Sequence, residues 1–214
     1  MKTYRPGNED GKGEIQRALP KLYQDKQGVI WLALSAKKTK LYRYNPALDR
    51  FLPVFPDAAA GQGDLPEAYY INAIVQDQRG RLLIGTLDGG LFALTFPKGR
   101  LEKPRVKQFR PNPENPYAII NHSVSGQMSE DQNGHIWIPT EGGLCRFDPR
   151  TDRFYPLEHP ASQMAANEDS FCWSTSFYPP HTLWVGTTNK GVLRINTANG
   201  DVRQFRGAPD DPNG

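Results

Sequence analysis

A block of eleven residues occurs four times along the chain and limits what the chain can fold into. The copies read QDKQGVIWLAL, QDQRGRLLIGT, EDQNGHIWIPT and FYPPHTLWVGT. Each carries an indole or aliphatic anchor at the same place: Trp31, Leu83, Trp137 and Trp184. The anchors are 52, 54 and 47 residues apart. This period is longer than that of most helical or leucine-rich solenoids and is close to the roughly 40 to 50 residues of a four-stranded propeller blade.

Each repeat divides into four short strands joined by hairpins. In the second copy an apolar run at 71–75 precedes the turn at 77–80, where Gly80 supplies the positive φ of a tight hairpin. Strands at 82–86 and 91–94 follow. The fourth strand of each copy ends on an aromatic side chain: Phe51, Phe109, Phe154 and Phe205. The sequence therefore predicts an all-β, β-propeller-type array of about four four-stranded antiparallel blades.

The repeats set the expected boundaries. We expect blades at 22–55, 70–110, 119–157 and 168–206, with 1–21 as a linker from a preceding blade and 207–214 as a linker to a following one. The segments FRPNPENPYA from Phe109 and FRGAPDDPNG from Phe205 align position for position, and YRPGNED near the start is similar. Both ends thus resemble junctions between blades, and the array is expected to be part of a larger propeller.

Composition removes several classes of function. The formal net charge of +3 in 214 residues is an ordinary excess and does not argue for nucleic acid. No stretch approaches the roughly 18 apolar residues of a membrane span, so no membrane contact is expected within this segment. The N-terminus also lacks the apolar core of a signal peptide. Two cysteines exclude a disulfide framework. Cys145 lies in an apolar strand pattern, as a buried free cysteine does.

The residues that recur with the period are expected to be structural. Trp31, Trp137 and Trp184 should fill the space between one blade and the next, because a binding residue has no reason to repeat with the fold. The aspartates at the start of the hairpins, Asp25, Asp77 and Asp131, should bond the turn backbone and not catalyse.

The order aspartate, glycine, aliphatic, tryptophan, aliphatic, Gly-Thr and then Gly-Gly-Leu resembles the two-component regulator propeller repeat. Asp77 to Leu91 is the best copy, apart from Leu83 in place of tryptophan. In the third copy Pro139 replaces the glycine, and in the first Leu34 replaces the threonine. The fourth copy has Pro179-Pro180-His181 in place of the aspartate-to-glycine turn. The four copies are in phase across nearly the whole chain.

This resemblance implies signal reception. Such repeats build the extracytoplasmic sensing region of bacterial hybrid histidine kinases, related transcription regulators and diguanylate cyclases, usually as long arrays ahead of a membrane span. It implies a periplasmic location. A cytoplasmic location stays open, because the sequence shows no signal peptide. The expected partners are a small-molecule or saccharide ligand and neighbouring blades of the same polypeptide. No cofactor, metal or catalytic residue is expected, and the kinase or cyclase lies outside this chain.

A ligand is expected at the first strands and the loops leading into them, because these converge on the central channel of a propeller. Aromatic and amide side chains there suit a sugar, through stacking and paired hydrogen bonds. The candidates are Tyr69, Tyr70 and Asn72 in the second blade, Asn121 and His122 in the third, and Ser170 and Trp173 in the fourth.

Two other functions stay open. Streptogramin lyases are propellers with similar repeats that use a histidine base and a metal ion; here His122 is the only histidine expected in a first strand. A standalone protein-binding scaffold fits the same fold and would show an exposed apolar patch. The end blades of a fragment would expose faces meant to be covered, so we also expect self-association of the isolated chain, including a homodimer.

Overall fold

The computed structural model describes residues 19–35, 40–55, 65, 70–97, 100–157 and 171–206. The first sheet contains β1 (Leu19–Gln24), β2 (Ile30–Ser35), β3 (Lys40–Asn45) and β4 (Arg50–Pro53). The second contains β5 (Ile71–Gln76), β6 (Leu82–Thr86), β7 (Gly90–Thr95) and β8 (Arg105–Phe109). The third contains β9 (Ser129–Glu130), β10 (Ile136–Thr140), β11 (Gly143–Asp148) and β12 (Arg153–Pro156). The fourth contains β13 (Cys172–Tyr178), β14 (Thr182–Thr187), β15 (Val192–Asn196) and β16 (Val202–Phe205).

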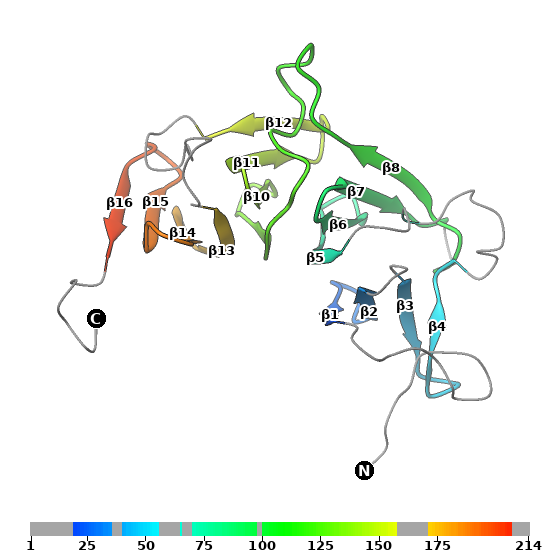
Figure 1. Ribbon diagram of the computed structural model, residues 1–214. Helices are drawn as coiled ribbons and strands as arrows, with labels where there is room; N and C mark the ends of the chain where they lie inside the picture. Colours follow the sequence, from blue (N-terminus) through cyan, green and yellow to red (C-terminus); the bar gives the residue numbers. More distant parts are fainter. Residues whose placement is uncertain are drawn as a thin grey trace.

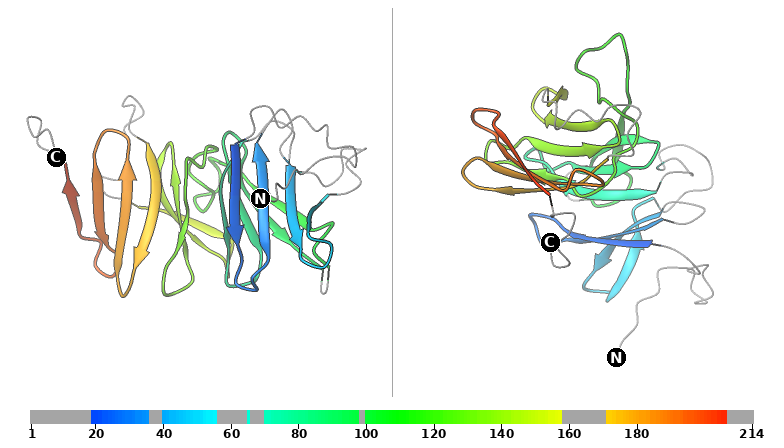
Figure 2. Two further views of the ribbon diagram at one scale, coloured as in Figure 1. Left: turned by 90° about the horizontal axis from the view of Figure 1, so that it is seen from below. Right: turned by 60° about the vertical axis from the view of Figure 1, so that its left-hand side comes forward.

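Each sheet is an antiparallel meander in which consecutive strands are neighbours. The four sheets form an open arc, with the first and fourth sheets at its two ends (Figure 1). The side view shows the sheets next to one another in chain order (Figure 2). This confirms the predicted all-β, propeller-type array of four four-stranded blades. The first sheet begins at Leu19, three residues before the expected boundary, because Leu19 is the partner of Ser35 in the β1–β2 ladder.

The hairpin aspartates bond the turn backbone, as predicted, and they also hold the anchor tryptophan. Asp25 Oδ1 accepts the backbone N–H of Gln27 at 3.0 Å and of Val29 at 2.8 Å, while Oδ2 accepts the indole N–H of Trp31 at 2.9 Å. In the third blade, Asp131 repeats these bonds, and its Oδ2 lies 3.1 Å from Trp137 Nε1. One carboxylate therefore fixes both the turn and the anchor of the following strand.

In the second blade an arginine replaces the tryptophan as the partner of the carboxylate. The anchor there is Leu83, which has no donor, and Asp77 Oδ2 instead accepts Arg81 Nε at 2.7 Å. Arg81 also contacts the third blade, through the carbonyl of Pro149 at 3.1 Å and Asp152 Oδ1 at 2.8 Å. This buried guanidinium therefore closes the hairpin and joins two blades at once.

Apolar clusters fill the seams between neighbouring sheets. Trp31 packs with β6 and β7 residues of the second blade, and Trp137 packs with β14 and β15 residues of the fourth. Both are buried as predicted, with exposed fractions of 2% and 5%. Trp184 has an exposed fraction of 36%, so it is not covered within the described part of the chain. It occupies the equivalent face of the last sheet in the arc, where no further sheet follows in the described part of the chain.

The two cysteines lie in the interior of the blades. Cys145 and Cys172 are free and buried, which confirms the prediction for Cys145. Burial raises the pKa of each thiol to about 12. Within the described ranges, no helix is long and apolar enough to cross a membrane.

The third blade departs from the predicted pattern at its first strand. His122 was expected in that strand, but β9 is only Ser129–Glu130. Residues 121 and 122 lie earlier, where Asn121 Oδ1 accepts the N–H of Ser123 at 2.7 Å and the His122 carbonyl accepts the N–H of Gly90 at 2.6 Å. The His122 carbonyl is thus bonded to the start of β7 in the second blade. Pairing with the third sheet begins only at the next residues, where Val124 forms an isolated bridge with Thr140 of β10.

Candidate ligand cavity on the inner strands

A cavity of about 500 Å³ lies along the inner strands of the arc. It takes residues from all four blades. The lining consists of Lys21, Leu22, Tyr23, Asn72, Ala73, Ile74, Val75, Ser125, Gly126, Gln127, Met128, Trp173 and Ser174. Its volume is within the range of small-molecule sites, and its lining mixes one large aromatic surface with scattered polar groups.

Trp173 provides the aromatic surface. Its side chain is large and its exposed fraction is 52%, although it stands at the start of β13. The indole N–H donates to Thr188 Oγ1 at 2.7 Å, and the same hydroxyl oxygen accepts the backbone N–H of Phe171 at 3.3 Å. The hydrogen bond fixes the ring while leaving much of it in contact with solvent. A fixed, exposed indole is suited to stacking on a ligand.

Residues 125–127 of the third blade pack against β13 next to Trp173. Ser125 Oγ donates to the carbonyl of Cys172, and Thr175 donates to the carbonyl of Gln127 through its N–H at 2.9 Å and its hydroxyl at 3.1 Å. Between them lies Gly126, where a side-chain carbon would overlap the carbonyl oxygen of Trp173. Residues 125–127 thus run against β13, and only glycine permits this approach.

The first two blades supply an amide, a phenol and an ammonium group to the lining. Asn72 donates through Nδ2 to the carbonyl of Val124 at 2.9 Å, which orients its amide. The Tyr23 hydroxyl oxygen accepts the N–H of Gln76 at 2.8 Å and keeps its own proton to donate. Burial raises the pKa of Tyr23 above 10.0, and the Gln76 N–H opposes this. The phenol is therefore a neutral donor at physiological pH, and Lys21 adds a positive charge.

The structure brings together two of the seven residues that the sequence predicts for ligand binding. Asn72 and Trp173 line the cavity. Tyr70 is exposed just before β5, and its carbonyl accepts the N–H of Leu87 at 2.9 Å. Asn121 and His122 lie before β9 in the third blade, outside the cavity lining. Tyr69 and Ser170 fall outside the described residues.

Sequence reasoning missed Tyr23, Gln127 and Ser174. Tyr23 belongs to the first blade, in which the sequence predicts no ligand-binding residue. Gln127 lies on the segment that replaces a regular first strand, and a parallel bridge joins it to Ser174. Tyr23 could have been found from its place one residue before Gln24, at the start of the repeated block. The Gln127 bridge has no sequence signal of its own.

The histidines within the described ranges serve the turns or stand at the surface. His135 Nδ1 lies 3.4 Å from Asp131 Oδ2, and His181 Nδ1 lies 3.0 Å from Gln132 Nε2. His122 is exposed, with Nε2 3.9 Å from Asp88 Oδ1. Among the described residues, no group of three histidine, cysteine, aspartate or glutamate side chains could hold a metal ion.

Comparisons with known proteins bear on the fold. No protein-family model matches the chain, and no curated protein matches it. Solved structures do. The extracellular domain of BT3049 from B. thetaiotaomicron, described as a hybrid two-component system, matches with a TM-score of 0.64 and 19% identity over 87% of this chain and 24% of that one. The extracellular domain of BT4673 from the same organism matches with a TM-score of 0.50 and 18% identity over 86% of this chain and 29% of that one.

A third structure has a different assigned role. PorZ, a surface component of the type-IX secretion system of Porphyromonas gingivalis, matches with a TM-score of 0.67 and 14% identity over 94% of this chain and 29% of that one. The chain therefore spans less than a third of the length of each of these three proteins. At these identities the likeness shows the fold, and that fold is the one which the resemblance to two-component regulator propeller repeats implies.

Proposed function

We propose that this chain is a non-catalytic, ligand-sensing segment of a larger propeller receptor. One observation carries the proposal: a single cavity takes its lining from the inner strands or segments of all four blades. A ligand bound there contacts every blade, so its binding free energy depends on how the blades are placed relative to one another. That dependence is what a receptor needs in order to convert occupancy into a change of arrangement.

We propose a saccharide as the ligand of the inner cavity. The indole of Trp173 is fixed by Thr188 and half open to solvent, which suits stacking on the apolar face of a sugar ring. The amide of Asn72 and the phenol of Tyr23 are oriented by backbone partners and supply hydrogen-bonding groups beside it. Lys21 extends the range to acidic sugars.

The proposed setting is the sensor region of a bacterial two-component or cyclase receptor in the periplasm. Its support is the resemblance of the repeats together with the fold shared with two extracellular domains of two-component systems. In this proposal the output is produced by a kinase or cyclase domain outside this chain, and the propeller itself performs no chemistry.

The proposed neighbour of the fourth blade is a further blade of the same polypeptide. Trp184, Val192 and Phe205 are exposed on one face of this sheet. Arg194 pairs with Trp184 across the β14–β15 ladder as Arg43 pairs with Trp31 in the first blade, where Arg43 reaches Glu102 of the second blade at 3.2 Å. By the same geometry, a covering blade would place a carboxylate opposite Arg194.

The test of the proposed function is a binding screen with neutral and acidic oligosaccharides, read by tryptophan fluorescence and confirmed by calorimetry. Trp173→Ala is expected to weaken binding of the best ligand at least tenfold. Tyr178→Ala is the matched control, because Tyr178 is an exposed aromatic residue on the same strand outside the cavity lining. Ligands that bind both variants as well as they bind the parent chain would contradict the proposed site.

A further inference from the structure

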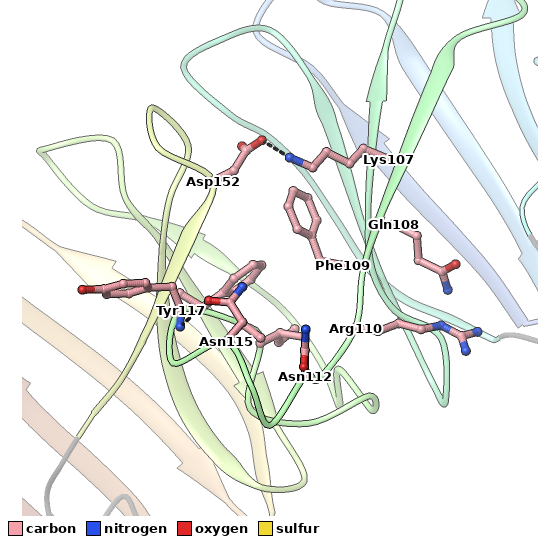
Figure 3. A pocket seen from close by; sticks show the side chains of 11 residues that line it. Lys107, Gln108, Phe109, Arg110, Asn112, Asn115, Tyr117 and Asp152 are labelled. Carbon is pink, nitrogen blue, oxygen red and sulfur yellow. Dashed lines mark hydrogen bonds and ion pairs between the residues drawn. The ribbon is translucent and has the colours of Figure 1, made fainter.

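A second cavity, of about 250 Å³, lies on the outer side of the arc between the second and third blades. We call it the seam pocket. Its walls are β8, the linker at 110–118 and β12 (Figure 3). No residue of this pocket contributes to the inner cavity, and no predicted ligand residue lies in it. Its polar lining includes two asparagines, a lysine and an aspartate, none of which lines the inner cavity.

Two asparagines in the linker have their side chains oriented by successive turns. Asn112 Oδ1 accepts the N–H of Glu114 at 3.0 Å, and Asn115 Oδ1 accepts the N–H of Tyr117 at 3.0 Å. Because each oxygen is turned to the backbone, each NH₂ group points the other way. Figure 3 shows both amide nitrogens directed toward the side of the pocket that holds Phe109. An amide NH₂ group only donates hydrogen bonds, so this wall of the pocket presents donors.

The charge of the pocket is positive despite the presence of Asp152. This carboxylate is paired with Arg81 at 2.8 Å and with Lys107 at 2.6 Å. Arg79 Nη1 also lies 3.6 Å from Asp152 Oδ1, and Arg81 is shared with Asp77. Three cations therefore face two anions, and the Lys107 ammonium has three donors, of which Asp152 takes one. Amide donors and a surplus cation together favour an anionic group.

The lining also has an apolar part. Phe109, Ala118, Ile119 and Phe154 form it, and Phe109 and Phe154 are in edge contact with ring centroids 5.3 Å apart. The volume is below the roughly 300 to 1,000 Å³ of drug-sized sites. The space fits an anionic group attached to a compact body of about one ring.

The amide pair belongs to this seam and not to the linker motif in general. In the aligned segment FRGAPDDPNG, Pro209 and Pro212 match Pro113 and Pro116. Ala208, however, stands in the position of Asn112, and Asp211 stands in the position of Asn115. The turn-forming prolines recur without the donors, so a linker of this kind does not require the two NH₂ groups.

From these observations we infer that the seam pocket binds a small carboxylate of about one ring in size, with the NH₂ groups of Asn112 and Asn115 as its donors. The body of the ligand lies against Phe109 and Phe154. Two sources share this chemistry: an acidic sugar such as a uronate and an aromatic acid such as a benzoate. The site is independent of the proposed saccharide cavity.

The test is equilibrium binding of glucuronate and of benzoate to the whole chain, with glucose and benzyl alcohol as neutral counterparts. At least one acid should bind ten times more tightly than its neutral counterpart. Asn112→Asp and Asn115→Asp, singly and together, keep the oxygen that accepts the backbone N–H but replace the donor with a negative oxygen. Each is expected to weaken binding at least tenfold. Asn45→Asp makes the same change in a first-blade turn, where Asn45 Oδ1 accepts the N–H of Leu48, and should leave binding within twofold.

The outcomes separate the sources and the sites. Tighter binding of glucuronate assigns the pocket to acidic sugars, and tighter binding of benzoate assigns it to aromatic acids. Trp173→Ala should leave the binding of the acid unchanged. If this variant loses that binding, the acid binds in the inner cavity and the inference is overturned. The inference is also overturned if neither acid binds, if the neutral counterparts bind equally well, or if the aspartate variants with the parent's melting temperature bind as the parent does.

Discussion

Lys26 of the first blade and Glu130 of the third blade form an ion pair across the edge of the blade between them, with Nζ 2.6 Å from Oε2. Lys26 is further held by its backbone N–H, which donates to Gln76 Oε1 at 2.9 Å in the second blade. Gln76 Nε2 in turn donates to Gln27 Oε1 at 2.7 Å. The first hairpin therefore contacts both following blades, and these contacts help to set the curvature of the arc.

The first prediction concerns the energy of that ion pair. Both side chains are partly exposed, so solvent and salt screen the interaction. A double-mutant cycle with Lys26→Met and Glu130→Gln should give a coupling of about 0.2–1 kcal/mol in urea unfolding. The coupling should fall when the same cycle is measured in 1 M salt. A coupling that is zero at low salt would mean that the curvature does not depend on this pair.

The second prediction uses the bond between the hairpin aspartate and the anchor tryptophan. Trp31→Phe and Trp137→Phe keep an aromatic ring but remove the indole N–H, which leaves the Oδ2 of Asp25 or Asp131 without that donor. Each should destabilise the chain by about 1–3 kcal/mol in chemical denaturation. Trp184→Phe is the matched control, because the fourth hairpin has no aspartate, and it should change stability by less than about 0.5 kcal/mol. Equal losses at all three positions would contradict the role of the carboxylate.

The fold could be predicted from the sequence because the signals that specify it are local and repeated. Glycine turns, hairpin aspartates and alternating apolar strands recur in phase, and Asp25 and Asp131 act as their positions predict. The exchange of Trp for Leu83 could be read from the sequence, but its compensation by Arg81 could not. That compensation depends on Pro149 and Asp152, which are about seventy residues away in the chain.

The candidate site was predicted less completely, for a physical reason. Asn72 lies on the inner strand β5, at the register shift between Ile71 and Ala73, and was found. The segment at 125–127 carries no strand pattern. Ser125 still bonds to Pro139 of β10, but Gly126 and Gln127 run against β13, and Gly126 is the residue that permits this. For Trp184, the repeat pattern identifies the face of the blade but not whether a neighbour within the described residues covers it.

The third prediction concerns acid stability. Burial acts to raise the pKa of Asp152, but hydrogen bonds from Lys107 and Arg81 outweigh it and hold the pKa below 3.8. A carboxyl group with a lowered folded-state pKa stabilises the fold above its unfolded pKa, and this contribution is lost as the pH falls through the folded value. The parent chain should therefore lose more stability between pH 5 and pH 2 than Asp152→Asn does, as measured by urea unfolding across that range.

The control for this experiment is Asp49→Asn. Asp49 and Asp152 both have a positive φ, of 46° and 56°, in equivalent hairpin turns, and asparagine accepts that conformation. A backbone effect of the substitution would therefore appear in both variants at neutral pH. A pH dependence of Asp152→Asn equal to that of the parent would show that the ion pairs with Arg81 and Lys107 do not couple protonation of Asp152 to folding.

The fourth prediction concerns the uncovered face of the fourth blade. Trp184 and Phe205 are in contact there, with ring centroids 5.6 Å apart, and Val192 is exposed beside them. Exposed aromatic and aliphatic side chains on one sheet face favour association. The isolated chain should therefore self-associate at high concentration in sedimentation experiments, and Trp184→Lys combined with Val192→Lys should reduce this. Leu48→Lys is the control, because Leu48 is an exposed residue in a hairpin turn of the first blade. A monodisperse monomer for the parent chain at high concentration would contradict the prediction, and equal association of the parent and the double variant would move the contact to another surface.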